Sequence, residues 1–331
     1  MKITYVYTDK WETEYIASCL PKESFIFLPG IINDYATFDQ ETQAIVVFIG
    51  SRVDTQVLNA LPQLKLIVTQ SVGFNHIDIA AAQSKKITVC NVPAYATHTV
   101  AEYTWALLLN LTRKIRESIN RPRHGSFSRN ELMGTDMHGK TMGIVGTGNI
   151  GTQVAHIARG FGMNVLAYDV HTNDSLAKQL GFTYVPFEQL LAQSDVISMH
   201  VTYNTQTHHM INLKNINTCK RGAYLVNTAR GEIIQTEALV QGLDSKILAG
   251  AALDVIEEEW LFCHEIQAIT KTHTNEELKR LVAIHYLLNH PQVIITPHNA
   301  FNSVEARKQR LDITIENIKA WQANKAINIV S

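Results

Sequence analysis

Residues 138–151 read HGKTMGIVGTGNIG, and this stretch decides the fold. The apolar run TMGIV precedes Gly146, Gly148 and Gly151, and a helical pattern over residues 150–161 follows it. A GxGxxG turn between a strand and a helix is typical of a dinucleotide site. Gly146 allows the tight turn, Gly148 lets a pyrophosphate approach the backbone, and Gly151 lets the helix pack against the strand. The helix N-terminus then presents free N–H groups to the phosphates.

An acidic residue stands where such a site needs one. The next apolar run ends in Tyr168-Asp169, eighteen residues after Gly151. A carboxylate at this position can accept hydrogen bonds from both adenosine ribose hydroxyls, and it would repel a 2′-phosphate. The pattern therefore favours NAD over NADP. The alternative, a glycine turn with an incidental acid, does not explain why strand, turn, helix and acid occur in this order.

Strand-like apolar runs alternate with helical stretches along the whole chain, which predicts α/β layers with parallel sheets. The runs are nearly continuous, as expected for strands covered on both faces. Those of the first third are residues 3–7, 44–50, 64–70 and 87–92. Those of the later part are residues 141–146, 164–169, 196–201, 223–228, 249–255 and 293–297. We predict two doubly wound parallel-sheet domains.

A long buried helix is predicted between the two series. Thr99 and Glu102 fit a capping box, and residues 105–111 are apolar nearly all round. Basic residues at 113–116 suit the C-terminal end of this helix, and a loop is expected at 121–125. The last stretch, from about residue 300, is another helix that cannot form a domain alone. We expect a discontinuous domain of residues 1–98 and 300–331 around a central Rossmann domain of residues 99–299.

The composition indicates a globular protein and excludes several classes of function. Of 331 residues, 46% are hydrophobic and 18% are charged, and the formal net charge is −1, so we expect no nucleic-acid partner. No apolar stretch reaches the roughly 20 residues of a membrane span, and MKITYVY reads as a strand rather than a signal peptide. The four cysteines lack CxxC spacing, so neither a disulfide framework nor a metal site is expected, Cys263 and its neighbour His264 included. A cytoplasmic location is the simplest interpretation.

Three polar segments follow later strands: NTARG (227–231), ALDVIEEE (252–259) and TPHNAF (296–301). Because ligands bind at the carboxyl ends of parallel strands, these segments can meet at one crevice with the nucleotide. Together with SVGFNHIDI (71–79) and NVPAYATHTVAEYTWALLL (91–109), they resemble the D-isomer-specific 2-hydroxyacid dehydrogenases, most closely the D-lactate dehydrogenase branch. The resemblance covers nearly the whole chain.

The resemblance implies a catalytic set of Arg230, Glu259 and His298. A guanidinium can hold the carboxylate and the carbonyl oxygen of a keto acid with one planar fork. His298 would be the acid in reduction and the base in oxidation, and Glu259 would orient its ring and favour the imidazolium. Glu257 and Glu258 adjoin Glu259, so the choice among the three rests on spacing from the preceding Asp.

The resemblance also implies NAD as the cofactor and a flavodoxin-like substrate domain whose backbone amides near Val72 and Gly73 bind the substrate carboxylate. The implied cofactor contacts are Gly146, Gly148, Asn149, Ile150, Gly151, Asp169, Val201, Thr202, Thr207, Thr228, Ala229 and Asp254. A homodimer through the central domain is implied as well. The adjacent His208 and His209 have no metal-ligand spacing and are expected to be structural or solvent-facing.

Phe301 follows His298 by three residues and predicts a narrow apolar space beside the third carbon of the substrate. No basic residue accompanies it in TPHNAFNS, so pyruvate and D-lactate fit best. The alternatives are a glycerate, phosphoglycerate or phosphonate dehydrogenase, or a NAD-sensing corepressor that binds protein partners. Turnover with NADH and keto acids would separate the enzymes from the corepressor.

Overall fold

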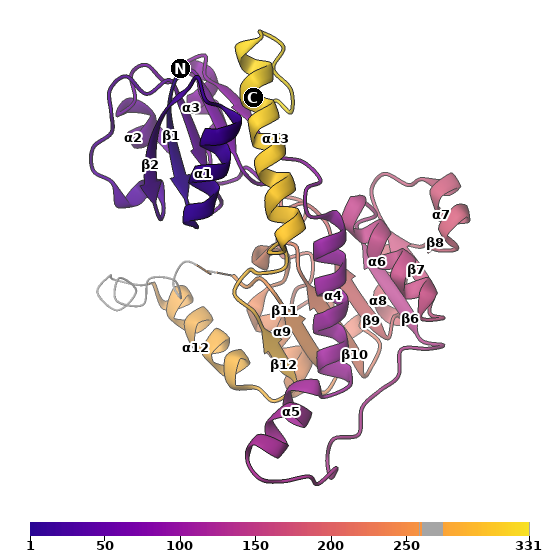
Figure 1. The fold of residues 1–331 in the computed structure, drawn as a ribbon. Coiled ribbons are helices and arrows are strands. Elements are labelled where there is room, and N and C mark those ends of the chain that lie inside the picture. The colour runs from indigo at the N-terminus through magenta and orange to yellow at the C-terminus, as the bar shows by residue number, and fades with distance from the viewer. Residues whose placement is uncertain (258, 260–273, 331) are drawn as a thin grey trace. The chain divides into compact units, whose positions relative to one another are not determined.

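The structure is a computed structural model that describes residues 1–257, 259 and 274–330. The chain folds into two compact units, Met1–Ala96 with Asn302–Ser331 and Thr97–Phe301. Each unit is built on a sheet whose strands pair in parallel only (Figure 1). The predicted fold class, two parallel α/β domains, is confirmed. Among the described helices, none combines the length and apolar character of a membrane span.

The first unit has the strand order β2-β1-β3-β4-β5, which is the flavodoxin order. Its strands are β1 (Lys2–Tyr7), β2 (Ser24–Pro29), β3 (Ala44–Val47), β4 (Leu66–Thr69) and β5 (Thr88–Cys90). Its helices are α1 (Lys10–Cys19), the 3-10 turn η1 (Ile32–Asp34), α2 (Thr55–Asn59), α3 (Ile79–Ser84) and α13 (Val304–Gln322). The two strands β3 and β4 are buried throughout, because helices cover both faces of the sheet.

The C-terminal helix α13 completes the first unit rather than extending the second. Its apolar side chains Leu311, Ile315 and Ile318 are buried with residues of β1, β3 and β4. Arg310 of α13 is 2% exposed, and its guanidinium pairs with the buried Glu12 of α1 at 2.6 Å. Apolar burial and an internal ion pair therefore fix the chain's last helix to its first residues.

The second unit has the order β12-β11-β10-β9-β6-β7-β8, so the connections reverse direction between β6 and β9. Its strands are β6 (Thr141–Val145), β7 (Asn164–Tyr168), β8 (Thr183–Tyr184), β9 (Val196–Met199), β10 (Ala223–Asn227), β11 (Leu248–Leu253) and β12 (Val293–Ile295). The helices are α4 (Thr97–Thr112), α5 (Ile115–Arg123), α6 (Asn149–Gly160), α7 (Asp174–Leu180), α8 (Phe187–Gln193), η2 (Ile216–Thr218), η3 (Gly231–Ile233), α9 (Thr236–Asp244) and α12 (Asn275–Asn289). Ligands bind at such a reversal, beyond the carboxyl ends of the strands.

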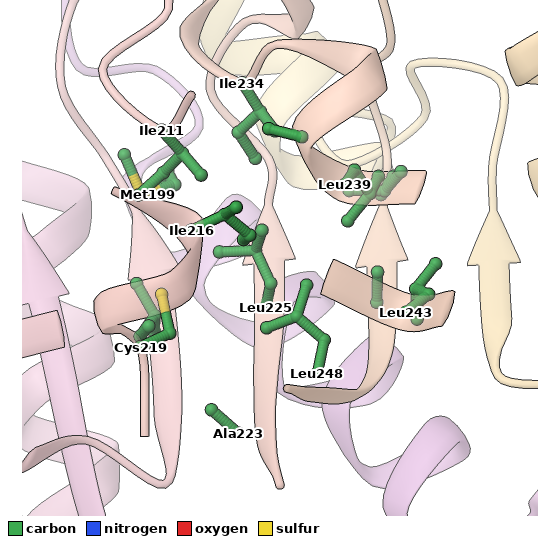
Figure 2. Close-up of a cluster of buried hydrophobic side chains, with 14 of the residues drawn as sticks. Met199, Ile211, Ile216, Cys219, Ala223, Leu225, Ile234, Leu239, Leu243 and Leu248 are labelled. Carbon is green, nitrogen blue, oxygen red and sulfur yellow. The ribbon is translucent and has the colours of Figure 1, made fainter. Parts of the chain in front are cut away.

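Two apolar clusters hold the second sheet between helical layers. Figure 2 shows one of them, in which side chains of η2 and α9 meet those of β9, β10 and β11. The other lies under α4, whose Trp105 and Leu108 are buried with residues of α6 and β6. Helix α4 contacts both a neighbouring helix and the sheet, which explains why its residues 105–111 are apolar on nearly every side.

The structure corrects several details of the sequence analysis. The edge strand β2 and the two-residue strand β8 were missed, because SFIFLP is half-buried and ends in Pro, and TY is too short to form a pattern. Helix α4 begins at Thr97, so Thr99 lies within its first turn and not at the predicted N-cap. Lys114 adopts a left-handed conformation (φ 50°) that ends α4, and α5 follows where a loop was expected.

Candidate active site

The glycine turn after β6 has the backbone that the motif demands. Gly146 has a φ of +96°, and a Cβ there would lie 2.8 Å from the His200 carbonyl carbon, so only glycine fits. A Cβ on Gly151 would overlap the Gly146 carbonyl oxygen, which explains why helix and strand can lie so close. At Gly148, in contrast, no described atom lies within 4 Å of a Cβ position. Contacts with the described residues therefore do not require glycine there, and the lack of a side chain leaves the turn open for a pyrophosphate to approach the backbone.

The first turn of α6 can hold the pyrophosphate of a dinucleotide. Within helix α6 the first backbone donor paired with an earlier residue is Thr152, which donates to the Gly148 carbonyl at 2.9 Å. Among the described residues, none accepts a hydrogen bond from the N–H of Asn149, Ile150 or Gly151. Three unpaired amides and the positive end of a 12-residue helix suit an anion. The residues present fit NAD.

Asp169 follows β7 and turns its carboxylate toward the glycine turn. Oδ2 accepts from the Thr147 backbone N–H at 2.6 Å and hydroxyl at 3.0 Å, and Oδ1 accepts from the His171 N–H at 3.0 Å. Burial alone would raise the pKa of this carboxyl, but the hydrogen bonds from His171 and Thr147 outweigh it and hold the pKa below its usual value. The carboxylate is therefore charged at neutral pH, as repulsion of a 2′-phosphate requires.

The loops after β9 and β10 place the remaining predicted cofactor contacts. The Thr207 hydroxyl donates to the Thr202 carbonyl at 2.8 Å, a bond within the loop after β9. Val201 packs against the apolar core. Thr228 bonds the buried Thr104 hydroxyl of α4 at 2.9 Å, and the Ala229 N–H donates to the side chain of Asn227 at 3.0 Å. Thr104 was missed by sequence reasoning, although a hydroxyl inside an apolar helical run is a signal.

Arg230 lies three residues beyond the end of β10. The buried Asn227 bridges this turn, because its Nδ2 donates to the Arg230 carbonyl at 2.8 Å. The Arg230 side chain is half-buried, and its guanidinium donates to the Ala229 carbonyl at 2.6 Å. One amide side chain thus fixes the backbone that carries the guanidinium. Among the described residues only the Ala229 carbonyl accepts from this guanidinium, so most of its five N–H donors can serve a ligand.

His298 and Glu259 form a pair on neighbouring segments after β12 and β11. His298 Nδ1 lies 2.9 Å from Glu259 Oε2, and both side chains are partly exposed, at 24% and 35%. Since a carboxylate only accepts, Nδ1 carries the hydrogen of this bond. Among the described residues no group bonds Nε2, so this nitrogen can exchange a proton with a ligand. The strands β10, β11 and β12 are neighbours, so Arg230, Glu259 and His298 follow the carboxyl ends of adjacent parallel strands.

A buried carboxylate holds the His298 turn. Asp254 is 1% exposed and accepts from the Thr296 hydroxyl at 2.5 Å and from the Asn299 and Ala300 N–H groups at 2.8 and 2.7 Å. Its backbone carbonyl accepts from the His298 N–H at 2.9 Å. These bonds support the left-handed backbone of His298 (φ 50°), which costs a side-chain-bearing residue about 1–2 kcal/mol. Asp254, predicted as a cofactor contact, is bonded in this structure to the histidine turn.

The structure also separates the adjacent glutamates. Glu257 is buried, and it pairs with His209 Nε2 at 2.7 Å and accepts from the Thr236 N–H and hydroxyl. It therefore caps the start of α9 rather than facing His298. His209 is half-buried and His208 is exposed, and the described residues contain no cluster of three potential metal ligands. Glu258, Cys263 and His264 lie outside the described residues.

Val72 and Gly73 lie in the first unit, in the loop after β4. The Val72 side chain is 48% exposed. Among the described residues, none accepts a hydrogen bond from the N–H of Val72 or Gly73. These amides are open to a ligand, as a carboxylate site would require.

Comparison with known proteins decides the family. The sequence model described as "D-isomer specific 2-hydroxyacid dehydrogenase, NAD binding domain" matches residues 105–300. The chain belongs to the D-isomer-specific 2-hydroxyacid dehydrogenase family. It is an oxidoreductase of this family, and its cofactor is NAD. The match covers the glycine turn, Asp169 and the segments that carry Arg230 and His298.

Relatives with several different activities are similar in sequence to this chain. A 2-hydroxyacid dehydrogenase homolog of Zymomonas mobilis is 37% identical over 86% of this chain and 85% of its own. D-lactate dehydrogenase kk1H of Curvularia clavata is 34% identical over 97% and 92%, and a glyoxylate reductase of Thermococcus litoralis is 35% identical over 85% and 81%. The solved D-lactate dehydrogenase of Aquifex aeolicus, complexed with NAD and lactic acid, has a TM-score of 0.88 and 33% identity, covering 98% of this chain and 96% of that one.

Proposed function

We propose that this dehydrogenase interconverts pyruvate and D-lactate. Bound NADH supplies the hydride that adds to C2 of the keto acid, and a proton must reach the carbonyl oxygen. The observation that carries the proposal is the His298–Glu259 pair, which leaves Nε2 open at the same end of the sheet as Arg230.

Each residue of the set has a distinct task in this proposal. The Arg230 fork binds the substrate carboxylate and polarises the carbonyl. His298 Nε2 donates its proton to the carbonyl oxygen during reduction and takes it back during oxidation. Glu259 accepts from Nδ1 throughout, so it keeps the ring oriented and stabilises the positive charge before the proton leaves.

Phe301 supports a small apolar substrate. Its ring stands edge-on to the His298 ring, with centroids 6.2 Å apart, so it borders the space beside the proposed acid. Residues 296–303 carry no Lys or Arg, so this segment offers no partner for a substrate phosphate. A methyl group suits this environment better than a phosphate or a charged chain. Glyoxylate, which lacks the methyl group, is the second candidate because glyoxylate reductases are among the relatives.

The two units receive different tasks. We assign Thr97–Phe301 to NAD and Met1–Ala96 with Asn302–Ser331 to the substrate carboxylate. The first assignment is supported by the glycine turn and by the span of the family match. The second is supported by the unpaired amides of Val72 and Gly73.

We also propose a homodimer through the second unit. Four large apolar side chains are exposed within residues 115–133: Ile115, Ile119, Phe127 and Met133, at 43%, 50%, 89% and 88%. These four lie in one short stretch of the sequence, and exposed apolar side chains of this size are typical of an interaction surface. Light scattering of the purified protein should give twice the mass of the chain, and Phe127→Asp should give the mass of one chain.

The substrate proposal is tested with NADH and a panel of keto acids. Pyruvate should give the highest kcat/KM, ahead of glyoxylate, hydroxypyruvate, 2-ketoisocaproate and phenylpyruvate, and the product should be the D-isomer. A preference for glyoxylate would assign the second candidate. Binding of NADH without turnover of any keto acid would refute the enzymatic proposal.

A further inference from the structure

The loop after β4 holds two successive carbonyls on defined partners. The Val72 carbonyl accepts from Asn91 Nδ2 at 2.8 Å, and the Gly73 carbonyl accepts from Ser71 Oγ at 2.6 Å. The chain has no cis peptide bond among the described residues. In a trans peptide the C=O and N–H point in opposite directions. The N–H groups of Gly73 and Phe74 are therefore turned away from Asn91 and Ser71.

Both amides are open to an anion. Among the described residues, none accepts from the N–H of Gly73 or Phe74, and the Phe74 side chain is 37% exposed. Successive free backbone N–H groups form an anion-binding concavity. Under the proposed function, on which this inference rests, the anion is the carboxylate of the keto acid.

The hydrogen bonds behind Ser71 can have only one direction. Ser71 donates its single hydroxyl proton to the Gly73 carbonyl, so it accepts from Thr69 Oγ1, which lies 2.7 Å away. The only hydroxyl proton of Thr69 is then engaged. Thr69 must accept from His76 Nε2, at 2.9 Å. The chain of hydrogen bonds therefore runs from the His76 ring through two hydroxyls to the Gly73 carbonyl.

The two hydroxyls in the middle of this chain of hydrogen bonds are sheltered from water, whereas His76 and Gly73 at its ends are partly exposed. Thr69 and Ser71 are 0% and 3% exposed, and a buried hydroxyl without a partner costs about 1–3 kcal/mol. Neither hydroxyl can turn away without leaving its neighbour unpaired. The Gly73 carbonyl is therefore held more firmly than an isolated loop peptide would be.

We propose that Thr69, Ser71 and His76 are positioning residues for the substrate carboxylate. They hold the peptide plane of Gly73 and Phe74 so that its N–H faces the anion, and His76 carries its proton on Nε2. They touch neither the keto carbonyl nor the nicotinamide, so their loss should weaken keto-acid binding more than the hydride step. Binding of NADH, which the other unit performs, should not depend on them.

The kinetic test removes the Thr69 hydroxyl, which joins His76 to Ser71. Thr69→Val keeps the shape of the side chain but breaks the chain of hydrogen bonds. It should raise the KM for pyruvate about tenfold, which corresponds to about 1.4 kcal/mol. The value of kcat should change less than threefold, and the Kd for NADH, measured by fluorescence, should not change. Thr69→Ser restores the hydroxyl and should recover most of the loss. Thr4→Val is the matched control, because it removes one member of a buried hydroxyl pair, Thr4 with Thr42 at 2.8 Å, in the same sheet. It should lower Tm without raising the KM for pyruvate.

An equal rise of KM in the Thr4 control, or no recovery with Ser, would reduce the role to general stability and overturn the proposal. A spectroscopic test does not depend on the substrate. Long-range ¹H–¹⁵N correlations at pH 8 should show the His76 proton on Nε2 in wild type, and a neutral ring protonated on Nδ1 would refute the proposed direction of the bonds. If no keto acid is turned over but the Nε2 tautomer is found, the proposed function fails while the hydrogen-bond chain stands.

Discussion

The role of Asp254 gives the most direct test of how the histidine turn is held. Asp254→Asn keeps the size of the side chain but replaces one carboxylate oxygen with an NH2 group, which cannot accept. The remaining oxygen can keep the bonds from Thr296 and Asn299, so the Ala300 N–H meets a donor instead of an acceptor. Losing a charge-assisted bond and leaving a buried N–H unpaired costs about 1–3 kcal/mol.

The free energy lost in this way is as large as the cost of the left-handed backbone conformation at His298. The turn that carries His298 should therefore populate other conformations in the variant. With a central value of about 2 kcal/mol, kcat should fall roughly 30-fold. The Kd for NADH, measured by fluorescence without keto acid, should change less than threefold, because the amides of α6 and Asp169 are untouched.

Asp195→Asn is the matched control for this substitution. Asp195 immediately precedes β9, at the amino-terminal end of the strands in the same sheet, where it accepts from the Thr141 N–H at 2.9 Å and pairs with Lys220. Its replacement should lower Tm with kcat within twofold of wild type. If Asp254→Asn instead raises the NADH Kd tenfold and leaves kcat unchanged, Asp254 is a cofactor contact and the argument from the turn is wrong.

Four further outcomes are expected. Asp169→Ala should lower the preference for NADH over NADPH, and an unchanged ratio of the two kcat/KM values would rule out a contact of Asp169 with the ribose. Because the fold holds the pKa of Asp169 below its usual value, the contribution of its carboxylate to stability should be present at neutral pH and lost as pH falls through that lowered pKa. Thermal melts of Asp169→Asn and wild type at acid and neutral pH can check this. Arg230→Lys should cost about 2–5 kcal/mol in kcat/KM, since an ammonium cannot replace the fork; wild-type kinetics would exclude it as the anchor. Glu259→Gln should lower kcat for pyruvate reduction with little change in Tm, whereas Glu257→Gln should lower Tm with little change in kcat, and the reverse pattern would exchange their roles. Phe301→Ala should raise activity on 2-ketoisocaproate relative to pyruvate about tenfold, given that a methylene in an apolar pocket is worth about 1–3 kcal/mol; an unchanged ratio would remove Phe301 from the substrate site.

Sequence reasoning found the parts of the fold that repeat a strong local pattern. The central strands are continuous apolar runs and the glycine turn has fixed spacing, so both could be recognised from the letters alone. Strand β8 has only two residues, and its pairing with β7 is a tertiary contact that no local pattern encodes. The break between α4 and α5 at Lys114 was hidden as well, because a left-handed residue that is not glycine has no clear signature.

The candidate site was predictable for its reactive groups and not for the residues that hold them. The segments that carry Arg230 and His298 stand out as polar stretches after apolar strands, and the family resemblance then singled out these two residues. Spacing from Asp254 selected Glu259 over Glu257 in the sequence, and the two side chains have different partners in the structure, His298 for Glu259 and His209 for Glu257. Thr69 and Asn227 bond to groups two to seven residues away, but which of the nearby polar groups each side chain reaches depends on the backbone conformation of its turn, and the sequence does not give that conformation.

The same arrangement recurs at three strand ends. After β10 the Asn227 amide donates to the Arg230 carbonyl. After β11 the Asp254 carboxylate accepts from the backbone N–H groups of the turn that carries His298. After β4 the Ser71 hydroxyl donates to the Gly73 carbonyl. In each case a buried polar side chain fixes the backbone, and the group offered to a ligand belongs to another residue. Because each holder is buried, its loss leaves unpaired donors or acceptors and shifts the backbone that it supports. Substitutions at the holders should therefore impair binding or turnover while the reactive groups themselves remain intact.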